Sequence, residues 1–494
     1  MENDKITKRN LWCFPVGTIG RDMVYALIAN FLLTYSMFTR QLSASQLGAI
    51  TAIMVAARVF DALNDPIMGN LIEFTRTKWG KFKPWLLAGA LTTSVVVIFL
   101  FNNTLDGWPF IIAFGICYFA YSITYTMNDI SYWGMIPALS RSAEARDAFT
   151  SRATLCAGIG NALASVAIPL FTTGALALGG NARSGYGILS ILICAIALFT
   201  QIFTLLGVRE NRDDMARKPE PFSFRKIITT ITGNDQLMWI SLCFLIHETG
   251  SALMAGGIGA TYIYLIYGYR GGLYSTFTLI GMSATAFLMI FYPAISKKFG
   301  RLRLMKLLAG ISVFGYALML GSLPMHGAMS GYWIFTIGFM FASFGQYGYY
   351  LIMMIAILNT VEYNEYRTGR RDEAIIASLR PFLTKMSSAF VVMLTSLIFI
   401  LFKVPDFTNR ISALENAASS GTITEAQKLA SIDEVLALAA HGQTAGLIFV
   451  TIALSLGMML ISYLIYRKNY ILDEKEYERI CSELAERKAP ASIA

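Results

Sequence analysis

The chain has 494 residues, of which 55% are hydrophobic and only 14% are charged. Soluble domains carry about 25% charged residues, and a soluble chain of this length divides into several domains joined by polar linkers. Here, apolar runs of about 20 residues, long enough to span a bilayer, follow one another with short loops between them. The composition therefore excludes an ordinary soluble protein and predicts an all-α membrane protein.

Twelve transmembrane helices are predicted in two six-helix bundles, and no cleavable signal peptide is expected before the first. The N-terminal bundle covers 1–208, a basic cytoplasmic linker covers 209–236, the C-terminal bundle covers 237–466 and a cytoplasmic tail covers 467–494. The predicted spans are 14–38, 47–72, 84–101, 109–137, 153–178, 186–208, 237–267, 273–295, 304–323, 331–361, 374–402 and 444–466.

The distribution of Lys and Arg predicts the orientation. Of the 40 such residues, 29 belong to the two termini and to the loops on the same side as them, and only six belong to the opposite loops. By the positive-inside rule both termini are cytoplasmic, and we expect a multi-pass protein of the plasma (inner) membrane. The formal net charge of +9 is mostly this bias, so no nucleic-acid partner is expected.

Several kinds of chemistry lack their sequence signals. None of the six cysteines falls in a predicted external loop, so no structural disulfide is expected, and no Cys/His cluster indicates a transition metal. The chain contains no HExxH or GxSxG motif. We therefore expect no enzymatic activity and no cofactor.

The two halves share a short repeat. The sequence TKWGKFKPWLLAG at 77–89 follows the second predicted span, and KKFGRLRLMKLLAG at 297–310 follows the eighth. In both, an aromatic residue, a glycine and a basic stretch precede LLAG. The shared position within each half favours a duplicated six-helix bundle over a chance match of two basic loops.

Two segments outside the spans have helical patterns. In the long external loop 403–443, Thr424 and Gln427 form a capping-box pattern that predicts a short surface helix. In the tail, four residues share one helical face and predict an amphipathic helix over 473–488: Tyr477, Ile480, Cys481 and Leu484. Neither segment is assigned any chemistry.

Ten charged residues that lie within the predicted spans, or directly beside one in the case of Arg152, are candidates for a site, because a charge in the membrane is costly unless it pairs or faces water. Five are acidic and five are basic, so simple pairing between helices stays open as an alternative. The distribution favours a functional site, because seven of the ten lie in the first half. The ten residues are Arg21, Asp22, Arg58, Asp61, Asp65, Asp129, Arg152, Glu248, Arg380 and Lys385.

The stretch FDALNDPIMG places Asp61 and Asp65 one helical turn apart on one face of the second span. Two neighbouring carboxylates repel each other, and a small cation removes that conflict. Na⁺ prefers oxygen ligands, which the two carboxylates and the Asn64 carbonyl oxygen supply, and Pro66 can free a backbone carbonyl nearby. The pair predicts a site for a coupling ion or proton, unless a salt bridge to Arg58 satisfies both carboxylates.

A second polar set points to a sugar. On the fourth span Thr126, Asp129 and Trp133 fall on one face, and a carboxylate beside an indole suits a carbohydrate, whose ring has polar edges and apolar faces. Trp133 can equally be an interfacial belt residue. Two further polar pairs lie on the first and eleventh spans: Arg21 with Asp22, and Arg380 with Lys385.

The run RVFDALNDPIMG, followed by RTKWGKFKPW, closely resembles the glycoside–pentoside–hexuronide:cation symporters, a melibiose permease-like family within the major facilitator superfamily. NDISYWGMIPAL at 128–139, VEYNEYR at 361–367 and LTKMSSAF at 383–390 extend the likeness over nearly the whole chain. The resemblance implies a major facilitator fold and cation-driven import of a glycoside or oligosaccharide by alternating access.

The resemblance also implies a role for each polar set. The cation site would consist of Asp61, Asn64, Asp65 and Thr126. The sugar would contact Asp22, Asp129, Trp133 and Arg152, helped by Arg21, while Lys385 would bridge the two sites. The expected partners are thus a small sugar or glycoside, a coupling cation and membrane lipid. The coupling ion is expected to be Na⁺, with H⁺ and Li⁺ as alternatives.

Two departures from the family pattern leave the substrate open. Arg380 occupies a place where the family pattern leads us to expect a neutral residue, and His247 with Glu248 interrupts a span expected to be largely uncharged. Arg380, Arg152 and Lys385 could clamp a carboxylate, which makes a hexuronide the alternative to a neutral sugar. Pairing of Arg380 with Glu248 is slightly favoured over this clamp. A lysolipid transporter on the same fold is a further, weaker alternative.

Overall fold

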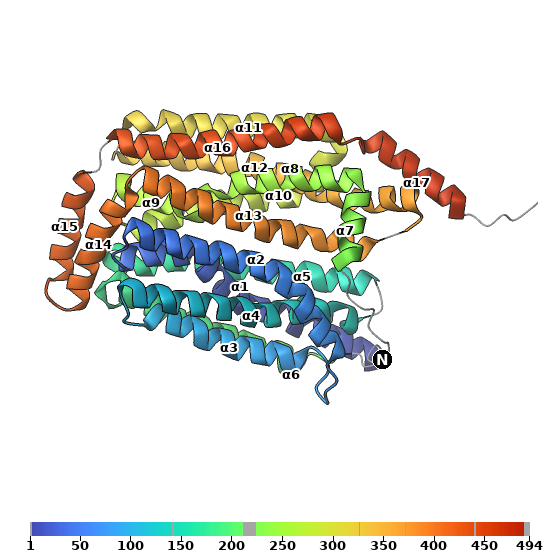
Figure 1. Cartoon of the computed structure of the whole chain (residues 1–494), viewed down its shortest axis with the longest axis horizontal. Coiled ribbons are helices and arrows are strands. Elements are labelled where there is room, and N and C mark those ends of the chain that lie inside the picture. Colours follow the sequence, from blue (N-terminus) through green and yellow to red (C-terminus); the bar gives the residue numbers. More distant parts are fainter. Residues whose placement is uncertain are drawn as a thin grey trace, which may run out of the picture. The chain divides into compact units, whose positions relative to one another are not determined.

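The computed structural model describes residues 2–140, 143–210, 224–325, 327–370, 372–438 and 441–488. These residues form helices joined by turns, and no strand occurs among them (Figure 1). The first half contains α1 (Glu2–Thr39), α2 (Ala44–Phe74), α3 (Lys83–Asn102), α4 (Gly107–Leu139), α5 (Ala143–Thr172) and α6 (Ala182–Gly207). The remainder contains α7 (Phe224–Gly233), α8 (Asp235–Ala252), α9 (Gly259–Tyr267), α10 (Gly271–Lys298), α11 (Arg301–Gly321), α12 (Met329–Thr368), α13 (Glu373–Leu401), α14 (Val404–Ser419), α15 (Glu425–Ala437), α16 (His441–Asn469) and α17 (Glu474–Lys488).

Ten of the described helices are long and apolar enough to span a membrane, and the bent helix α2 supplies an eleventh. The predicted span over 237–267 is not one straight helix, because a short π-helical turn, η4 (Met254–Ile258), separates α8 from α9. Gly257 has a φ of +105°, which glycine adopts without strain, and it lies at this break. The protein is a multi-pass helical membrane protein, and the count of twelve spans is not confirmed within the described part of the chain.

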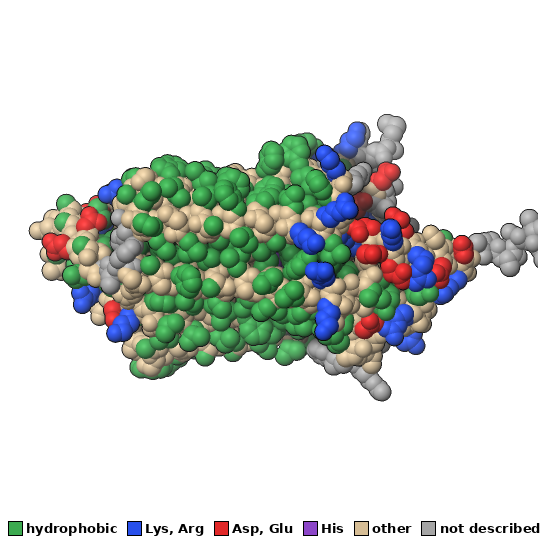
Figure 2. Space-filling view, turned by 90° about the horizontal axis from the view of Figure 1, so that it is seen from above, with side chains coloured by type: hydrophobic (Ala, Val, Ile, Leu, Met, Phe, Trp, Pro, Cys, Tyr) green, Lys and Arg blue, Asp and Glu red, His purple; other side chains and the backbone are tan. Residues whose placement is uncertain are grey.

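The outer surface of the long helices is apolar. Figure 2 shows hydrophobic side chains over the long helices on one face, with Lys, Arg, Asp and Glu side chains gathered at the helix ends. Large apolar side chains are exposed on individual helices, such as Val95 on α3 and Leu206 on α6. An apolar surface of this kind fits contact with lipid rather than with water.

The contacts divide the chain into two compact units. Unit 1 comprises Met1–Phe222, Ala255–Leu279 and Val392–Thr444, and unit 2 comprises Ser223–Met254, Ile280–Val391 and Ala445–Ala494. The units do not follow the order of the sequence, because α10 and α13 each have one part in either unit. The division into an N-terminal and a C-terminal bundle stays a prediction.

The predicted linker over 209–236 contains a helix. Residues 211–223 lie outside the described residues, and α7 follows them directly. Asn234 then caps α8, because its side chain accepts a hydrogen bond from the backbone N–H of Leu237 at 2.9 Å. No pattern noted in the sequence predicts α7.

Glycines bring the helices of unit 1 close together. α1 packs against both α5 and α6. A Cβ atom on Gly160 of α5 would lie 2.1 Å from the carbonyl oxygen of Ile19, and a Cβ atom on Gly20 would lie 2.3 Å from the Cα of Ala197 on α6. Small residues at such crossings are typical of helix packing in membranes. The two contacts directly precede Arg21 and so hold this part of α1 in place.

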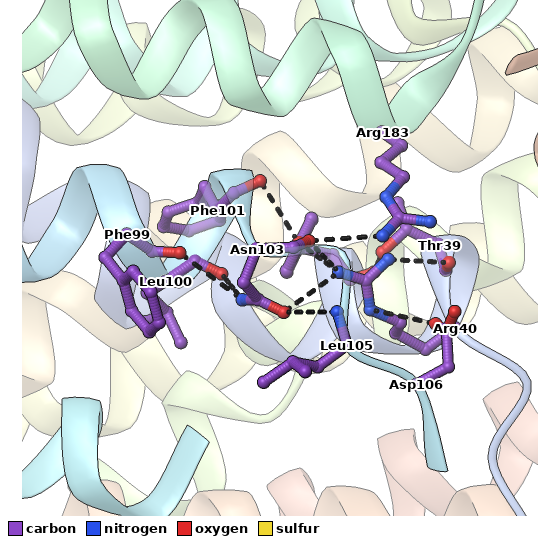
Figure 3. Close-up of polar contacts among 10 residues, drawn as sticks. Thr39, Arg40, Phe99, Leu100, Phe101, Asn103, Leu105, Asp106 and Arg183 are labelled. Atoms are coloured by element: carbon purple, nitrogen blue, oxygen red, sulfur yellow. Dashed lines mark hydrogen bonds and ion pairs between the residues drawn. The ribbon is translucent and has the colours of Figure 1, made fainter. Parts of the chain in front are cut away.

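One end of unit 1 carries the connections that join α1 to α2, α3 to α4 and α5 to α6. Arg40 is only 1% exposed there, and its Nη2 atom donates to the carbonyl oxygen of Asn103 at 2.9 Å. Arg183 donates to the same oxygen at 3.1 Å (Figure 3). Asp106 lies 3.5 Å from the Nε atom of Arg40 and balances one of the two positive charges. These contacts tie the ends of α1, α3 and α6 together.

Helices α14 and α15 form a helical hairpin, named the hairpin below, which packs against other parts of unit 1. α14 contacts α1 and α6, and Figure 1 shows both hairpin helices running across the direction of the long helices. The capping box of Thr424 and Gln427 at the start of α15 is confirmed. The other hairpin helix, α14, is not predicted by any pattern noted in the sequence.

A buried ion pair joins the two hairpin helices to the rest of unit 1. The Nζ atom of Lys428 lies 3.3 Å from a carboxylate oxygen of Glu415, and both side chains are completely buried. Glu415 also accepts the backbone N–H of Ala182 at 2.7 Å, and Lys428 donates to the carbonyl oxygen of Gly180 at 2.6 Å. Burial raises the pKa of the Glu415 carboxyl, although the attraction of Lys428 opposes the shift.

The opposite end of unit 1, called here the basic end, contains residues 75–83 and 207–210. Glu210 accepts hydrogen bonds from the backbone N–H groups of Lys81 at 3.0 Å and Lys83 at 3.2 Å, so its carboxylate lies at the N-terminus of α3. The Nζ atom of Lys83 donates in return to the carbonyl oxygen of Val208, just after α6, at 2.6 Å. The start of α3 is therefore capped by Glu210, which follows α6, and the end of α6 is capped by Lys83 of α3.

The same capping arrangement recurs in unit 2. Glu474 accepts a hydrogen bond from the backbone N–H of Arg301 at the N-terminus of α11, at 2.5 Å. The Arg301 side chain donates to the carbonyl oxygen of Leu472 at 3.2 Å. Glu474 comes two residues after Leu472 in the sequence, just as Glu210 comes two residues after Val208 in unit 1. The structural repeat matches the repeat found in the sequence, since α3 and α11 begin within its two copies.

The predicted amphipathic helix in the tail is confirmed as α17. Ile480 and Leu484 on its apolar face are buried and belong to the hydrophobic core of unit 2. α17 packs on α12, so this part of the tail is a structural element of unit 2.

Candidate functional site

Helix α2 bends within the predicted cation motif. It starts at a capping box made by Ser43 and Gln46 and contains Pro66 in its interior. Proline has no N–H to donate to the carbonyl four residues earlier, and its ring clashes with that carbonyl. The helix accordingly bends by 41° between Asp61 and Leu63. The bend lies inside the motif and changes the direction of the helix between the two carboxylates.

The two carboxylates of α2 face hydroxyl groups of α4. Ser122 donates a hydrogen bond to Asp61, and Thr126 donates one to Asp65 at 3.4 Å. The Nδ2 atom of Asn64 is buried and has no hydrogen-bond partner among the described residues. The structure thus brings Asp61, Asp65 and Thr126 of the predicted cation site to one interface between α2 and α4, and it adds Ser122. Asn64 lies on α2 next to Asp65, and no contact of its side chain with α4 is found among the described residues.

Ser122 is a residue that the sequence analysis missed, although a signal exists. Ser122 and Thr126 are four residues apart on α4, as Asp61 and Asp65 are on α2, so both pairs repeat once per helical turn. Two helices with matching spacing can place two oxygen pairs opposite each other. A single serine in an apolar span does not indicate an ion site. Only the matching spacing on α2 and α4 gives that indication.

Arg58 forms a long ion pair with Asp61 beside this interface. Its Nη1 atom lies 3.8 Å from Asp61, which is beyond the distance of a hydrogen bond. The guanidinium group is buried and interacts electrostatically with Tyr25, Tyr118 and Tyr121. Tyr118 and Tyr121 form a stack along α4, with ring centroids 6.3 Å apart. Arg58 therefore balances charge near Asp61 but does not occupy both of its oxygens through hydrogen bonds.

A second polar cluster joins α1 to α4. The Nη2 atom of Arg21 donates to Asp22 at 2.8 Å, and its Nη1 atom lies 3.1 Å from Asp129. The guanidinium carbon also lies over the rings of Tyr132 and Trp133, at 4.8 Å and 5.3 Å from their centroids. Arg21 thus contacts three other predicted sugar-site residues, which are Asp22, Asp129 and Trp133. Tyr132 is the one member of the cluster that the sequence did not predict. Two carboxylates against one guanidinium leave one net negative charge with aromatic rings beside it.

The other predicted substrate residues lie elsewhere. The structure places Arg152 over the ring of Trp12, 5.4 Å from the centroid, with its Nη1 atom 3.4 Å from the carbonyl oxygen of Leu11. No contact between Arg152 and the Arg21 cluster is found among the described residues. Lys385 belongs to unit 2, and its predicted bridging role stays a prediction.

Arg380 is also part of unit 2, where it interacts electrostatically with Glu248. Its Nη1 atom donates to the hydroxyl of Tyr350 at 3.3 Å. His247, next to Glu248, is buried against the carbonyl oxygen of Gln346 at 3.1 Å and so belongs to the packing of unit 2. The two departures from the family pattern both lie in unit 2, but no ion pair between Arg380 and Glu248 is found among the described residues, so their pairing stays a prediction.

The two clusters of unit 1 differ in chemistry. The α2–α4 interface brings together carboxylate and hydroxyl oxygens, which are the donor set preferred by Na⁺ and similar hard cations. The Arg21 cluster presents carboxylates, a guanidinium and an indole, which can bind hydroxyl groups and stack on a sugar ring. Within the described residues, no group of three or more His, Cys, Asp or Glu side chains is placed to hold a metal ion.

Comparison with known proteins gives a consistent family assignment. A family model described as "MFS/sugar transport protein" matches residues 13–417. The Lactose permease of Lactobacillus delbrueckii subsp. bulgaricus is 27% identical over 489 residues, which cover 95% of this chain and 71% of that protein. The Raffinose carrier protein of Pediococcus pentosaceus is 27% identical over 95% of this chain and 70% of that protein.

A third relative, the Glucuronide carrier protein homolog of Escherichia coli (strain K12), is 24% identical over 78% of this chain and 82% of that protein. The chain spans between 60% and 71% of the length of the lactose and raffinose relatives that it matches. The relatives compared above are permeases or carriers.

Solved structures share the fold at low sequence identity. A bacterial homolog to the human lysosomal transporter Spinster, in an inward-facing and unoccupied conformation, superposes with a TM-score of 0.61 at 10% identity, covering 94% of this chain and 98% of that chain. A D-xylose-proton symporter superposes with a TM-score of 0.58 at 12% identity, covering 86% and 99%. At such identities the likeness concerns the fold alone.

Proposed function

The chain belongs to the MFS/sugar transport protein family and has the major facilitator fold, and from this premise we propose that it is a cation-coupled symporter that imports a glycoside or oligosaccharide by alternating access. The names of its relatives, a lactose permease and a raffinose carrier, support a neutral di- or oligosaccharide as the substrate. Because the family and the solved neighbours are transporters, we assign transport rather than an enzymatic reaction.

The observation that carries the proposal is the pairing of Asp61 and Asp65 on α2 with Ser122 and Thr126 on α4. Two carboxylates and two hydroxyls converge where α2 bends, and the nearest guanidinium in that interface does not hydrogen-bond to Asp61. We assign this interface to the coupling cation, with Na⁺ as the first choice and H⁺ or Li⁺ as alternatives. The neutral oxygens favour Na⁺, since a proton needs no such ligands.

We assign the sugar to the Arg21 cluster. Asp22 and Asp129 accept hydrogen bonds from sugar hydroxyls, and Trp133 stacks on an apolar ring face. Lys385 is a further contact proposed from the family resemblance, whereas Arg380 departs from the family pattern and is a candidate contact only for a carboxylate. Arg152 is the weakest member of the assignment, because it lies against Trp12.

A glucuronide is the second candidate substrate. One relative is named as a glucuronide carrier protein homolog, and a carboxylate-bearing sugar would suit the guanidinium of Arg380. The attraction between Glu248 and Arg380 opposes this reading, because Glu248 would compete with a substrate carboxylate for the guanidinium. We therefore rank the glucuronide below the neutral sugar.

The test is uptake by purified protein in liposomes with an imposed Na⁺ gradient or an imposed pH gradient. Lactose, raffinose, a glucuronide and a lysophospholipid form the panel. Accumulation of a neutral sugar driven by the Na⁺ gradient is the expected result. Accumulation of the glucuronide alone would select the second substrate, and gradient-independent movement of the lysophospholipid would replace the proposal by lipid transport.

We propose that both termini are cytoplasmic in a plasma (inner) membrane protein, from the distribution of Lys and Arg. Labelling of single cysteines by a membrane-impermeant maleimide tests this in intact cells. A cysteine at exposed position 421, between α14 and α15, should react from outside, and one at exposed position 78 should not. The reverse pattern would contradict the orientation.

A further inference from the structure

A cleft opens on the outside of unit 1 at the basic end. Its volume is about 800 Å³, and it is lined by residues that precede or begin α3 and by residues that end α6. The lining residues are Lys78, Trp79, Lys83, Leu87, Ile202, Leu205, Leu206, Arg209 and Glu210. None of them belongs to the two clusters proposed for the cation and the sugar.

The walls of the cleft are held rigidly by the reciprocal caps. Glu210 is bound by two backbone N–H groups at the start of α3, and Lys83 is bound to the carbonyl oxygen of Val208 after α6. Asn10 of α1 adds a third anchor, since its side chain exchanges hydrogen bonds of 3.1 Å with the backbone N–H and carbonyl oxygen of Arg209. The cleft is thus built into the fold and is not a gap between loose loops.

The charge of the lining is positive. Lys78, Lys83 and Arg209 contribute three positive charges, and Glu210 contributes one negative charge. The Glu210 carboxylate is already stabilised by the N-terminus of α3, where backbone N–H groups favour an anion. The side chains facing the cleft therefore favour a further anion.

Part of the lining of the cleft is apolar and exposed. Leu206 is 79% exposed and Trp79 is 63% exposed, and both line the cleft. Exposed apolar residues continue along the same two helices, with Val95 on α3 and Phe199 on α6. A tryptophan beside basic residues at the end of an apolar surface is typical of the membrane–water boundary.

We propose that this cleft binds one anionic phospholipid, with the phosphate against Lys78, Lys83 and Arg209 and the acyl chains along the exposed faces of α3 and α6. Basic pockets between transmembrane helices at the membrane boundary bind acidic headgroups by charge, while the hydrocarbon surface retains the chains. The site is separate from the proposed transport sites, so its failure would not affect the assignment of function.

The experiment is native mass spectrometry of the full chain in detergent with phosphatidylglycerol and with phosphatidylcholine of the same acyl chains. One phosphatidylglycerol should bind more tightly than phosphatidylcholine. The double variant Lys78→Gln/Arg209→Gln should lower its affinity by about fivefold for each cation removed. The matched control is Arg303→Gln/Lys306→Gln, which removes two exposed charges from α11 and should leave the affinity unchanged.

A second measurement does not depend on these variants. Brominated phosphatidylglycerol should quench the fluorescence of Trp79 more than brominated phosphatidylcholine does, as judged by the difference between the natural chain and Trp79→Phe. Equal affinity for both lipids, an unchanged affinity in the double variant, or equal quenching by both lipids would overturn the proposal. Full competition by soluble glycerol 3-phosphate would also overturn it, because the site would then bind an anion rather than a lipid.

Discussion

At the scale of single residues, Arg21 organises the proposed sugar site. Its guanidinium contacts Asp22 and Asp129 and lies over Trp133, so one side chain joins three of the groups assigned to the sugar. Asp129 retains more exposure than Asp22, with 35% of its side chain accessible against 17%. It is therefore the carboxylate more open to a hydroxyl from outside the cluster.

Replacing the carboxylates at this arginine should separate sugar binding from cation binding. Asp22→Ala and Asp129→Ala each remove a hydrogen-bond acceptor and leave Arg21 with a single carboxylate. We expect the Kd for the sugar to rise at least about tenfold, which corresponds to about 1.4 kcal/mol, while cation binding is retained. Isothermal titration with sugar and with Na⁺ measures both, and a selective loss of cation affinity would reverse the site assignment.

Variants of the proposed cation site should lose ion-driven accumulation but keep some sugar binding. Asp61→Asn and Asp65→Asn keep the size of the side chain but remove the negative charge that a cation needs. Accumulation of sugar driven by the ion gradient should fall to the level of empty liposomes, whereas some sugar binding should persist. Ser122→Ala serves as the comparison, because it removes a neutral oxygen and keeps both charges. Concentrative uptake by both Asn variants would show that the ion binds elsewhere.

The sequence predicts which residues of a site share a helix face, but it does not predict which residues of another helix lie opposite them. The spacing of Asp61 and Asp65 shows that they share a face, because helix geometry fixes the direction of every side chain. The spacing cannot show which helix lies opposite, so Ser122 emerges only from the packing of α2 on α4. Arg152 was assigned through the family pattern, and its position over Trp12 depends on a side-chain conformation that no sequence pattern encodes.

At the scale of helices, the apolar periodicity predicts most spans but not their breaks. The run through α8 and α9 is continuous in hydropathy except at His247 and Glu248, so the sequence predicts one span there. The break depends on the backbone conformation at Gly257, which hydropathy does not report. Helix α14 escaped prediction for a different reason. Its buried face includes Thr408, Ser412 and Glu415, and polar residues on a buried face hide the helical period.

The hairpin supplies a stability prediction. Lys428→Met leaves Glu415 as a buried carboxylate without its cation and also leaves the carbonyl of Gly180 without this donor. Breaking a buried ion pair in this way costs about 3–5 kcal/mol, so the hairpin should detach from unit 1. Hydrogen exchange of the α14 and α15 amides measures the detachment. Arg410→Gln, an exposed charge on α14, is the matched control and should change stability by no more than about 0.5 kcal/mol.

The pH dependence of this variant provides a separate prediction. Because burial raises the pKa of Glu415, the folded carboxyl binds its proton at a higher pH than the unfolded one. The folded state then holds more protons than the unfolded state within that window, and the free energy of unfolding decreases as pH rises through it. The loss of protection in Lys428→Met should therefore be larger near pH 8 than at about pH 5. Equal protection at both pH values would contradict a buried charged Glu415.

At the scale of the whole molecule, the proposal requires that the two sites communicate. If Na⁺ raises the affinity for sugar by some factor, sugar must raise the affinity for Na⁺ by the same factor. The carboxylates of α2 bind hydroxyl groups of α4, and Arg21 of α1 contacts Asp129 of α4, so one helix carries residues of both clusters. α4 is thus the element through which the occupancy of one site can alter the other.

Titration of purified protein at constant pH measures this coupling. The Kd for sugar should fall by about 5–150-fold when Na⁺ replaces a large inert cation, as is usual for coupled sites, and the Kd for Na⁺ should fall by the same factor when sugar is present. A variant such as Asp65→Asn should bind sugar with the same Kd in both solutions. Equal affinity of the natural chain with and without Na⁺ would rule out Na⁺ coupling and direct attention to protons.

The hairpin has a practical consequence for imaging the protein. The turn between α14 and α15 contains Gly421, with a φ of +73°, and residues on either side of it are exposed. Both helices leading to that turn are anchored, through Glu415 and Lys428, to the backbone at the start of α6. A compact globular partner fused at this turn would stand outside a detergent micelle in a fixed direction, and it would give electron cryomicroscopy the alignment landmark that a chain of buried helices otherwise lacks.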